Sequence, residues 1–341
     1  MGSGLVRNIG KTKPYHHIGV IGAGSWGTAL ALAAAGAGRT VTLWAREPRL
    51  AAQMSASRQN AAYLPGVPLP EAISPTAVLA EAAAAEAVLM AVPAQHLRAS
   101  LRIAAAFFKK GTPVVITAKG VEQDSGKLLN EVLAEAAPEV EPAMLSGPSF
   151  ARDVARHLPT AVTIAAKMDV ARRLQASLGS AYFRPYASDD VIGVALGGAA
   201  KNVYAIACGI VEGLGLGESA RAALLARGFA ELCRLGEAVG GRIETLMGLS
   251  GLGDLVLSAT SRSSRNFAFG VAIGSGTPRT ELFAGDRPLA EGIATAPALL
   301  SRAKSHGIEL PVAEAVARIL DGSLALADAA PRLMMRPLKT E

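Results

Sequence analysis

The sequence predicts an α/β fold in two parts, a doubly wound Rossmann-type sheet over residues 15–190 and an all-helical domain over residues 191–341. Apolar strand patterns alternate with helical patterns as far as about residue 190, and no convincing strand follows. Such alternation is typical of a parallel sheet covered by helices, with ligands at the carboxyl ends of the strands. The length of 341 residues also exceeds what one hydrophobic core usually organises. Residues 1–14 contain no apolar run of signal-peptide length and are expected to form a disordered extension.

The first βαβ unit contains a glycine turn. An apolar strand over residues 18–21 leads into residues 22–27, which read GAGSWG; a helix follows over 28–35 and a second strand over 41–44. In this spacing Gly22 makes a tight turn, Gly24 lets the backbone approach a pyrophosphate, and Gly27 lets the helix pack closely on the strand. The free N–H groups and positive dipole end of the helix then face the phosphate. These features predict a dinucleotide-binding site.

The remaining elements follow from hydrophobic periodicity and glycine punctuation. Further strands are expected over residues 87–92, 113–117, 143–145 and 161–165, and helices over residues 97–108 and 126–137. In the second domain, helices are expected to be broken at residues 213–217, 240–241, 248–253 and 274–276.

The end of the second strand carries the residues that would contact the adenosine ribose. Arg46 lies two residues after this strand, where a 2′-phosphate would be accommodated, so NADP is a plausible cofactor. Glu47 comes next and leaves NAD as an alternative cofactor, because an acidic side chain binds the free ribose hydroxyl. A solvated surface arginine is the alternative interpretation of Arg46.

The composition limits the kinds of partner that the protein is expected to bind. The formal net charge of +6 suits nucleic acid, an anionic membrane or a phosphorylated small molecule. Lys and Arg are scattered, however, and no nucleic-acid-binding signature is present, which argues against nucleic acid. Cys208 and Cys233 lie in apolar helical stretches and are expected to be buried thiols in a reducing cytoplasm. The five histidines show no ligand spacing with them, so no structural metal is expected.

Lys201 is the candidate proton donor. Residues 191–211 are long and apolar enough to suggest a membrane span, but Lys201 and Asn202 lie at their centre, which favours a buried helix of a soluble protein. Lys201 is the only charged residue in this stretch, at the predicted junction of the two domains. Burial would lower its pKa towards neutrality, as reduction of a ketone requires of its general acid. A lysine that reaches the surface at a helix kink is the alternative.

Four loops could hold substrate. Lys119 and the segment 146–151 (SGPSFA) follow two predicted strands at their carboxyl ends, where ligands gather. Asp254 lies in a glycine loop among apolar residues, and the segment 264–266 (SRN) could clamp a phosphate through a bidentate arginine and two hydrogen-bonding neighbours. Ordinary turns and surface loops are about equally compatible with these residues.

Five separated motifs together resemble bacterial glycerol 3-phosphate dehydrogenase, in order from about residue 18 to residue 319. The segments SRN at 264–266 and AEG at 290–292 extend the resemblance. The five motifs are GAGSWGTA at 22–29, AKG at 118–120, SGPSFA at 146–151, LGGAAKN at 196–202 and GLGDL at 251–255.

The resemblance implies reversible reduction of dihydroxyacetone phosphate to sn-glycerol 3-phosphate with NADH or NADPH, feeding glycerophospholipid synthesis. It also implies a cytoplasmic homodimer with no membrane span and a helical domain like that of 6-phosphogluconate dehydrogenase. Lys201 matches the family's catalytic proton acceptor for alcohol oxidation. The matching substrate contacts are Lys119, Gly147, Ser149, Lys201, Asp254, Ser264, Arg265 and Asn266. The matching cofactor contacts, with the glycines of the turn, are Gly22, Gly24, Ser25, Trp26, Gly27, Arg46, Lys119, Ala151, Arg265, Leu289 and Glu291.

The sequence departs from the family pattern at two places, and two other functions are alternatives to the one that the resemblance implies. Leu289 stands where valine is frequent, and the amino-terminal extension is longer than usual. Dehydrogenases of 3-hydroxy acids or of 6-phosphogluconate also pair a Rossmann domain with a helical lysine. A non-catalytic NADPH sensor is an alternative of a different class, against which Lys201 and Asp254 in an apolar setting argue.

Overall fold

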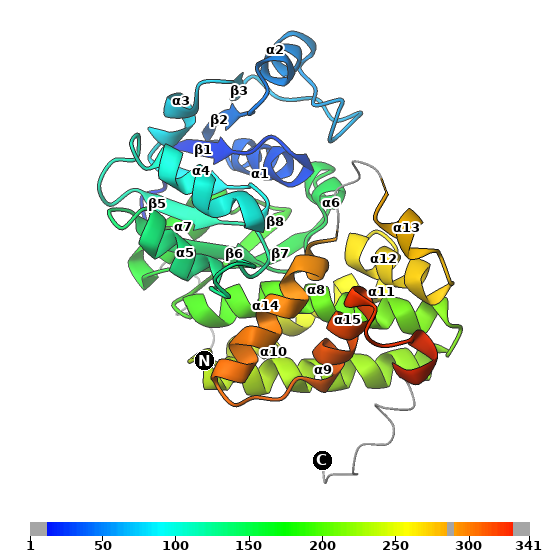
Figure 1. Cartoon of the computed structure of the whole chain (residues 1–341). Helices are drawn as coiled ribbons and strands as arrows, with labels where there is room; N and C mark the ends of the chain where they lie inside the picture. Colours follow the sequence, from blue (N-terminus) through cyan, green and yellow to red (C-terminus); the bar gives the residue numbers. More distant parts are fainter. Residues whose placement is uncertain (1–11, 285–289, 330–341) are drawn as a thin grey trace, which may run out of the picture. The chain divides into compact units, whose positions relative to one another are not determined.

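The computed structural model describes residues 12–284 and 290–329, and the chain divides into two compact units (Figure 1). The first unit comprises residues 1–118 and 129–195, and the second comprises residues 119–128 and 196–341. The change of unit therefore falls a few residues inside the helix predicted to open the second domain. Of the predicted extension, residues 1–11 lie outside the described part of the chain.

The first unit contains an eight-stranded sheet in the order β3-β2-β1-β4-β5-β6-β7-β8. The Rossmann-type fold class predicted from the sequence is confirmed. Neighbouring strands pair in parallel except β6 and β7, which are antiparallel. The strands are β1(His17–Ile21), β2(Thr40–Trp44), β3(Ile73–Thr76), β4(Ala87–Met90), β5(Pro113–Ile116), β6(Glu141–Ser146), β7(Thr160–Ala165) and β8(Phe183–Ser188).

The two edge strands, β3 and β8, are the ones that the sequence pattern did not predict. Each contains a proline, Pro75 in β3 and Pro185 in β8. Proline lacks a backbone N–H and is tolerated in a sheet chiefly at its edges, so a run that contains it does not look like a central strand. The central strands β4 and β5 are buried along their whole length, which is why their sequences are uniformly apolar.

Helices and short helical turns connect the strands of this unit. The first, α1, has eight buried residues out of twelve and is rich in alanine, which lets it approach the sheet closely. The helical elements are α1(Ser25–Gly36), α2(Pro48–Ser57), α3(Leu79–Ala83), η2(Ala94–His96), α4(Leu97–Ala104), α5(Leu129–Ala136), α6(Ala151–Ala155) and α7(Met168–Leu178).

The second unit is helical throughout its described elements, and a break falls at each of the predicted glycine segments. The breaks at residues 261–264 and 306–310 were not predicted. At residues 248–253 the expected break takes the form of a π-helical turn between two α-helices. The elements are α8(Val191–Gly213), which begins in the first unit, α9(Glu218–Ala238), α10(Ile243–Met247), η3(Leu249–Gly253), α11(Asp254–Thr260), α12(Arg265–Gly274), α13(Arg279–Leu282), α14(Glu291–Ser305) and α15(Pro311–Asp321).

The helix α8 is long and apolar enough to cross a membrane by length and composition, but 89% of its most apolar window is buried inside the protein. Its glycines allow close helix packing. A Cβ atom on Gly209 would lie 2.2 Å from the carbonyl oxygen of Phe267, and one on Gly213 would lie 2.3 Å from that of Val271. The backbones of α8 and α12 therefore touch, and α8 behaves as the core helix that the central Lys201 and Asn202 predicted.

A buried carboxylate ties three helices of the second unit together. Glu231 of α9 is 3% exposed and accepts hydrogen bonds from the backbone N–H groups of Val312 and Ala313, in the first turn of α15. Tyr204 of α8 donates its hydroxyl to the same carboxylate. An acidic group suits a helix N-terminus, because it satisfies N–H groups that have no partner within the helix.

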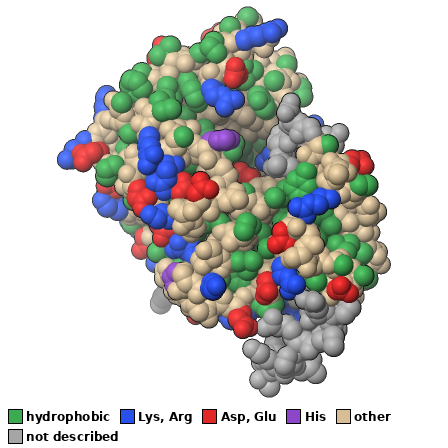
Figure 2. Space-filling view, viewed as in Figure 1, with side chains coloured by type: hydrophobic (Ala, Val, Ile, Leu, Met, Phe, Trp, Pro, Cys, Tyr) green, Lys and Arg blue, Asp and Glu red, His purple; other side chains and the backbone are tan. Residues whose placement is uncertain are grey.

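Charged side chains are intermingled on the visible face of each unit, where basic and acidic groups alternate without one large field of either sign (Figure 2). On this face the basic groups are dispersed, in agreement with the scattered Lys and Arg of the sequence. The two cysteines are free thiols. Cys208 is buried as expected, whereas Cys233 is only partly buried, because it lies at the margin of the buried face of α9.

Candidate active site

The glycine turn after β1 has the geometry that the sequence predicted. Gly22 has a φ of +114°, and a Cβ atom there would lie 2.5 Å from the carbonyl oxygen of Ala91. A Cβ atom on Gly27 would lie 1.8 Å from the carbonyl oxygen of Gly22, so only glycine lets α1 approach the turn. A Cβ atom on Gly24, in contrast, would meet nothing within 4 Å. Open space thus lies above the residue that must let a pyrophosphate approach.

The start of α1 suits the phosphates of a dinucleotide. Its N-cap residue is Gly24, which has no side chain to cap the helix, and its first turn contains no acidic residue. The positive end of the helix dipole and the amide groups of the first turn therefore favour an anion. Asn60, 0% exposed, donates to the carbonyl oxygen of Ala23 and to Thr28, which fixes the turn from behind. These residues fit a nicotinamide dinucleotide.

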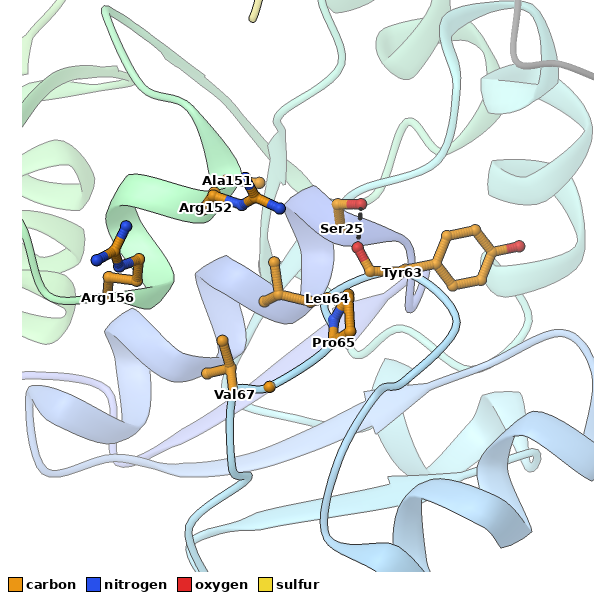
Figure 3. A pocket seen from close by; sticks show the side chains of 9 residues that line it. Ser25, Tyr63, Leu64, Pro65, Val67, Ala151, Arg152 and Arg156 are labelled. Carbon is orange, nitrogen blue, oxygen red and sulfur yellow. Dashed lines mark hydrogen bonds between the residues drawn. The ribbon is translucent and has the colours of Figure 1, made fainter.

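A pocket of about 520 Å³ opens beside the start of α1 (Figure 3). Ser25 and Ala151, both predicted cofactor contacts, contribute to its wall. Ser25 donates its hydroxyl to the carbonyl oxygen of Tyr63 at 2.7 Å, which holds the loop after α2 against the glycine turn. Arg152 extends from α6 towards this end of α1, adding positive charge that the sequence motifs did not single out.

Two other predicted contacts of the first unit have contrasting environments. The side chain of Arg46 is 82% exposed and pairs with Glu47 at 3.3 Å. The residue that would favour NADP, Arg46, and the residue that would favour NAD, Glu47, are therefore both at the surface. Gly147 has a φ of +147°, and a Cβ atom on it would lie 2.8 Å from the Cα atom of Val162. Ser149 donates its hydroxyl to the carbonyl oxygen of Gly147 at 2.9 Å, which shapes the loop after β6.

The second unit holds a buried cluster of charges around Asp254. One carboxylate oxygen accepts from the Nζ atom of Lys201 at 2.5 Å, and the other accepts from the Nζ atom of Lys119 at 2.6 Å. Asp254 is 1% exposed and Lys201 is 6% exposed. Lys119 reaches the cluster because residues 119–128 belong to the second unit although they follow a strand of the sheet. The structure thus joins three predicted site residues from distant parts of the sequence.

The cluster changes the acidity of its members. Burial, with a smaller contribution from the charge of Lys119, lowers the pKa of Lys201 to about 8, although Asp254 opposes this fall. Burial of Asp254 opposes its ionisation, yet the two ammonium groups and their hydrogen bonds together lower the pKa of Asp254 below its usual value. This pKa lies in the range in which an acid–base catalyst works best.

Two polar residues of this cluster were not among the predicted contacts. Lys201 donates to the hydroxyl of Ser258 at 2.7 Å, and Ser258 lies one helical turn after Asp254 on α11. Asn202 donates its amide to the carbonyl oxygen of Lys119 at 2.9 Å, which holds the Lys119 backbone beside α8. The spacing of four residues from Asp254 to Ser258 was a signal for the first; no pattern in the sequence indicated the second.

The predicted phosphate clamp forms the amino terminus of α12. Ser264 is the N-cap and accepts from the backbone N–H of Phe267, while Arg265 is the first helical residue and is exposed. The carboxamide of Asn266 is largely engaged, because it donates to Asn202 at 2.8 Å and accepts from the backbone N–H of Gly292 at 2.9 Å. Asn266 thus links α8, α12 and the start of α14.

Glu291 begins α14 close to the same charges. Burial raises the pKa of its carboxyl group, while Arg265, Lys201 and Lys119 oppose this rise. The predicted cofactor contacts Lys119 and Glu291 are therefore electrostatic neighbours of Lys201, and Arg265 is an electrostatic neighbour of Glu291. Leu289, also predicted to contact the cofactor, lies outside the described residues.

Comparisons with known proteins agree with this geometry. Residues 17–171 match the model of the NAD-dependent glycerol-3-phosphate dehydrogenase N-terminus, and residues 190–330 match that of its C-terminus. The chain is 54% identical over 331 residues to glycerol-3-phosphate dehydrogenase (NAD(P)+) from Parvibaculum lavamentivorans, covering 97% of this chain and 99% of that protein. It is 56% identical to the enzyme of the same name from a Bradyrhizobium species, covering 96% and 98%.

A solved structure shows the same fold. The crystal structure of glycerol-3-phosphate dehydrogenase from Coxiella burnetii matches with a TM-score of 0.89 and 39% identity, covering 94% of this chain and 99% of that chain. Family models cover both units, and relatives more than half identical align over nearly the whole chain. The chain therefore belongs to the NAD-dependent glycerol-3-phosphate dehydrogenase family.

Proposed function

We propose that this protein catalyses the reversible reduction of dihydroxyacetone phosphate to sn-glycerol 3-phosphate with NAD(P)H, and that Lys201 is its general acid. The observation that carries the catalytic assignment is the buried ion pair of Lys201 with Asp254, at 2.5 Å. A lysine in this position combines a fixed ammonium group with a pKa of about 8. A general acid needs both properties at near-neutral pH.

Reduction of the ketone requires a hydride on C2 and a proton on the C2 oxygen. A bound nicotinamide supplies the hydride. Lys201 donates the proton from Nζ to the oxygen, which becomes the hydroxyl of the product, and takes it back in the reverse direction. Asp254 accepts a hydrogen bond from Lys201 and keeps the ammonium group aimed, while Ser258 fixes it from a second direction. Lys119 adds positive charge that stabilises negative charge developing on the oxygen.

We assign the binding of the substrate phosphate to the amino terminus of α12. Arg265 stands at the first position of a ten-residue helix, where backbone N–H groups and the helix dipole also favour an anion. Ser264 can donate its hydroxyl hydrogen, since its oxygen accepts from Phe267. Asn266 has one amide hydrogen beyond its bond to Asn202. By family membership, Gly147 and Ser149 bind the remainder of the substrate, and Glu291 and Ala151 contact the cofactor.

Replacing Arg265 by alanine is expected to raise the KM for dihydroxyacetone phosphate by about 10- to 150-fold, because a charge-assisted hydrogen bond contributes about 1.5 to 3 kcal/mol. The matched control is Arg262→Ala, which removes an exposed arginine three residues away. The measurement is the loss of nicotinamide absorbance at about 340 nm. Unphosphorylated dihydroxyacetone should be a poor substrate of the wild type and should lose little from Arg265→Ala. Equal KM values for both ketones in the wild type would contradict the assignment of a phosphate-binding site to the start of α12.

The wider setting is also a proposal. We infer that the enzyme acts in the cytoplasm as a homodimer and supplies backbone for glycerophospholipids, because these properties accompany the family to which it belongs. Sedimentation equilibrium would give the number of chains in the particle.

A further inference from the structure

The position of Asp254 depends on an unusual turn. The helix α10 ends at Met247, the π-helical turn η3 covers Leu249–Gly253, and α11 begins with Asp254 itself. Single π-helical turns inside helical segments occur frequently at functional sites, because the wider turn displaces the residues that follow it. The backbone of η3 therefore determines where the carboxylate of Asp254 lies.

This turn touches α8 one helical turn away from Lys201. A Cβ atom on Gly197 would lie 2.7 Å from the carbonyl oxygen of Ser250 and 3.1 Å from the Cα atom of Gly251. Gly197 and Lys201 are four residues apart and so share a face of α8. The backbone contact of Gly197 and the ion pair of Lys201 thus both connect α8 to the segment 249–254, one helical turn apart.

The turn is also closely packed against the end of α10. A Cβ atom on Gly251 would lie 2.0 Å from the carbonyl oxygen of Leu246, so the backbone of η3 is already pressed against the end of α10. Ser250 and Leu246 are both 0% exposed. Close-packed interiors transmit small displacements rather than absorbing them. Any group added at Gly197 would therefore move the turn and with it the residue that follows.

We propose that Gly197 is a positioning residue for proton transfer, whose backbone contact with the Ser250–Gly251 turn sets the separation of Lys201 from Asp254. This inference rests on the proposed function of Lys201 as general acid. Gly197 touches neither substrate nor cofactor in this account; it acts through the turn. Glycine is thus needed at this position because it places no side chain between the two backbones.

The electrostatic consequence has a definite sign. The charged groups that act on Lys201 are Asp254 of α11, Lys119 of the segment 119–128 and Glu291 of α14. Burial and Lys119 lower the pKa of Lys201, whereas Asp254 and Glu291 raise it. A turn pushed away from α8 weakens the Asp254 contribution and leaves burial unchanged. The pKa of Lys201 should then fall below its value of about 8.

The test compares two glycine-to-alanine variants of the same helix. Gly197→Ala crowds η3, and the matched control Gly213→Ala crowds the carbonyl oxygen of Val271 at 2.3 Å, twelve residues from Lys201. Both should unfold at lower temperature than the wild type. Only Gly197→Ala should lower kcat for ketone reduction, by about tenfold or more, since misplacement of about 1 Å can cost 10²-fold. Only this variant should move the midpoint of the pH–kcat profile to lower pH, with the Kd for NADH unchanged.

The outcomes separate this inference from the proposed function. Should Gly197→Ala and Gly213→Ala share the wild-type pH midpoint and similar kcat values, Gly197 has only a structural role and the inference fails. Lys201→Ala in the same assay is the check on the proposed function, which fails if that variant keeps its turnover. If Gly197→Ala yields no folded protein, Ser250→Ala replaces it, because it removes the side-chain bond from the turn to Thr245. It should shift the midpoint in the same direction by a smaller amount, and no shift would overturn the inference.

Discussion

Replacing Lys201 by alanine is expected to lower kcat for the reduction of dihydroxyacetone phosphate by about 10² to 10⁴-fold, the usual contribution of a positioned general acid. The expectation follows from the burial of Lys201 and its two fixed partners, Asp254 at 2.5 Å and Ser258 at 2.7 Å. Water has limited access to a side chain that is 6% exposed, so it cannot readily replace the lost proton donor. Steady-state absorbance of the reduced nicotinamide measures the effect.

The control for this variant must separate catalysis from folding and cofactor binding. Lys304→Ala removes an exposed lysine from the same unit and should keep wild-type turnover. Lys201→Ala should bind NADH with the wild-type Kd in a fluorescence titration, because Lys201 is not among the predicted cofactor contacts. Turnover of Lys201→Ala within tenfold of the wild type would assign the acid to another residue.

Replacing Asp254 by asparagine should reduce both stability and catalysis. The carboxylate is shared by two ammonium groups, and removing one member of a buried ion pair costs about 3 to 5 kcal/mol, because the partner charge stays buried. The pKa of Asp254 is lowered from an ordinary value of 3.8, so its stabilising contribution is present at neutral pH and is lost only as the pH falls through the lowered value. Urea unfolding at pH 7 measures the loss.

A second buried aspartate supplies the comparison for Asp254→Asn. Asp190 is 6% exposed and accepts from the backbone N–H of Gly193, and it is not among the charged groups that act on Lys201. Asp190→Asn should lower stability without moving the pH midpoint of kcat. Asp254→Asn should move that midpoint to lower pH, since Asp254 raises the pKa of Lys201. Equal midpoints in the two variants would show that Asp254 has no electrostatic effect on the proton donor.

The parts of the fold that are locally encoded were predictable. Gly22 has a φ of +114°, and the steric requirement of Gly27 acts against the carbonyl oxygen of Gly22 within one βαβ unit, so the spacing alone indicated the turn that the structure shows. The central strands were equally clear, because burial on both faces requires apolar residues throughout. The edge strands β3 and β8 were not predicted because Pro75 and Pro185 interrupt their apolar runs. The antiparallel pairing of β6 with β7 was not predicted because periodicity does not indicate the direction in which two strands pair.

The candidate site was predictable as a set of residues but not as a network. An isolated lysine in an apolar helix and an aspartate in a glycine loop indicated buried charge, but left open whether Asp254 orients Lys201 or a substrate hydroxyl. The bond of Lys119 to Asp254 spans 135 residues, and it exists because the segment 119–128 joins the helical unit. Asn266 was predicted to bind phosphate, yet much of its carboxamide links α8 to α14, a role that only the fold reveals.

The pH dependence of kcat in both directions tests most directly whether Lys201 exchanges the proton of the reaction. With a pKa of about 8, Lys201 should be protonated below that pH and should act as the acid for ketone reduction, so reduction should slow as the pH rises through about 8. Oxidation of glycerol 3-phosphate needs the neutral amine and should accelerate over the same range. Mirror-image profiles with a shared midpoint, both abolished in Lys201→Ala, are the predicted result. Profiles that stay flat through pH 8, or that persist in Lys201→Ala, would contradict the account.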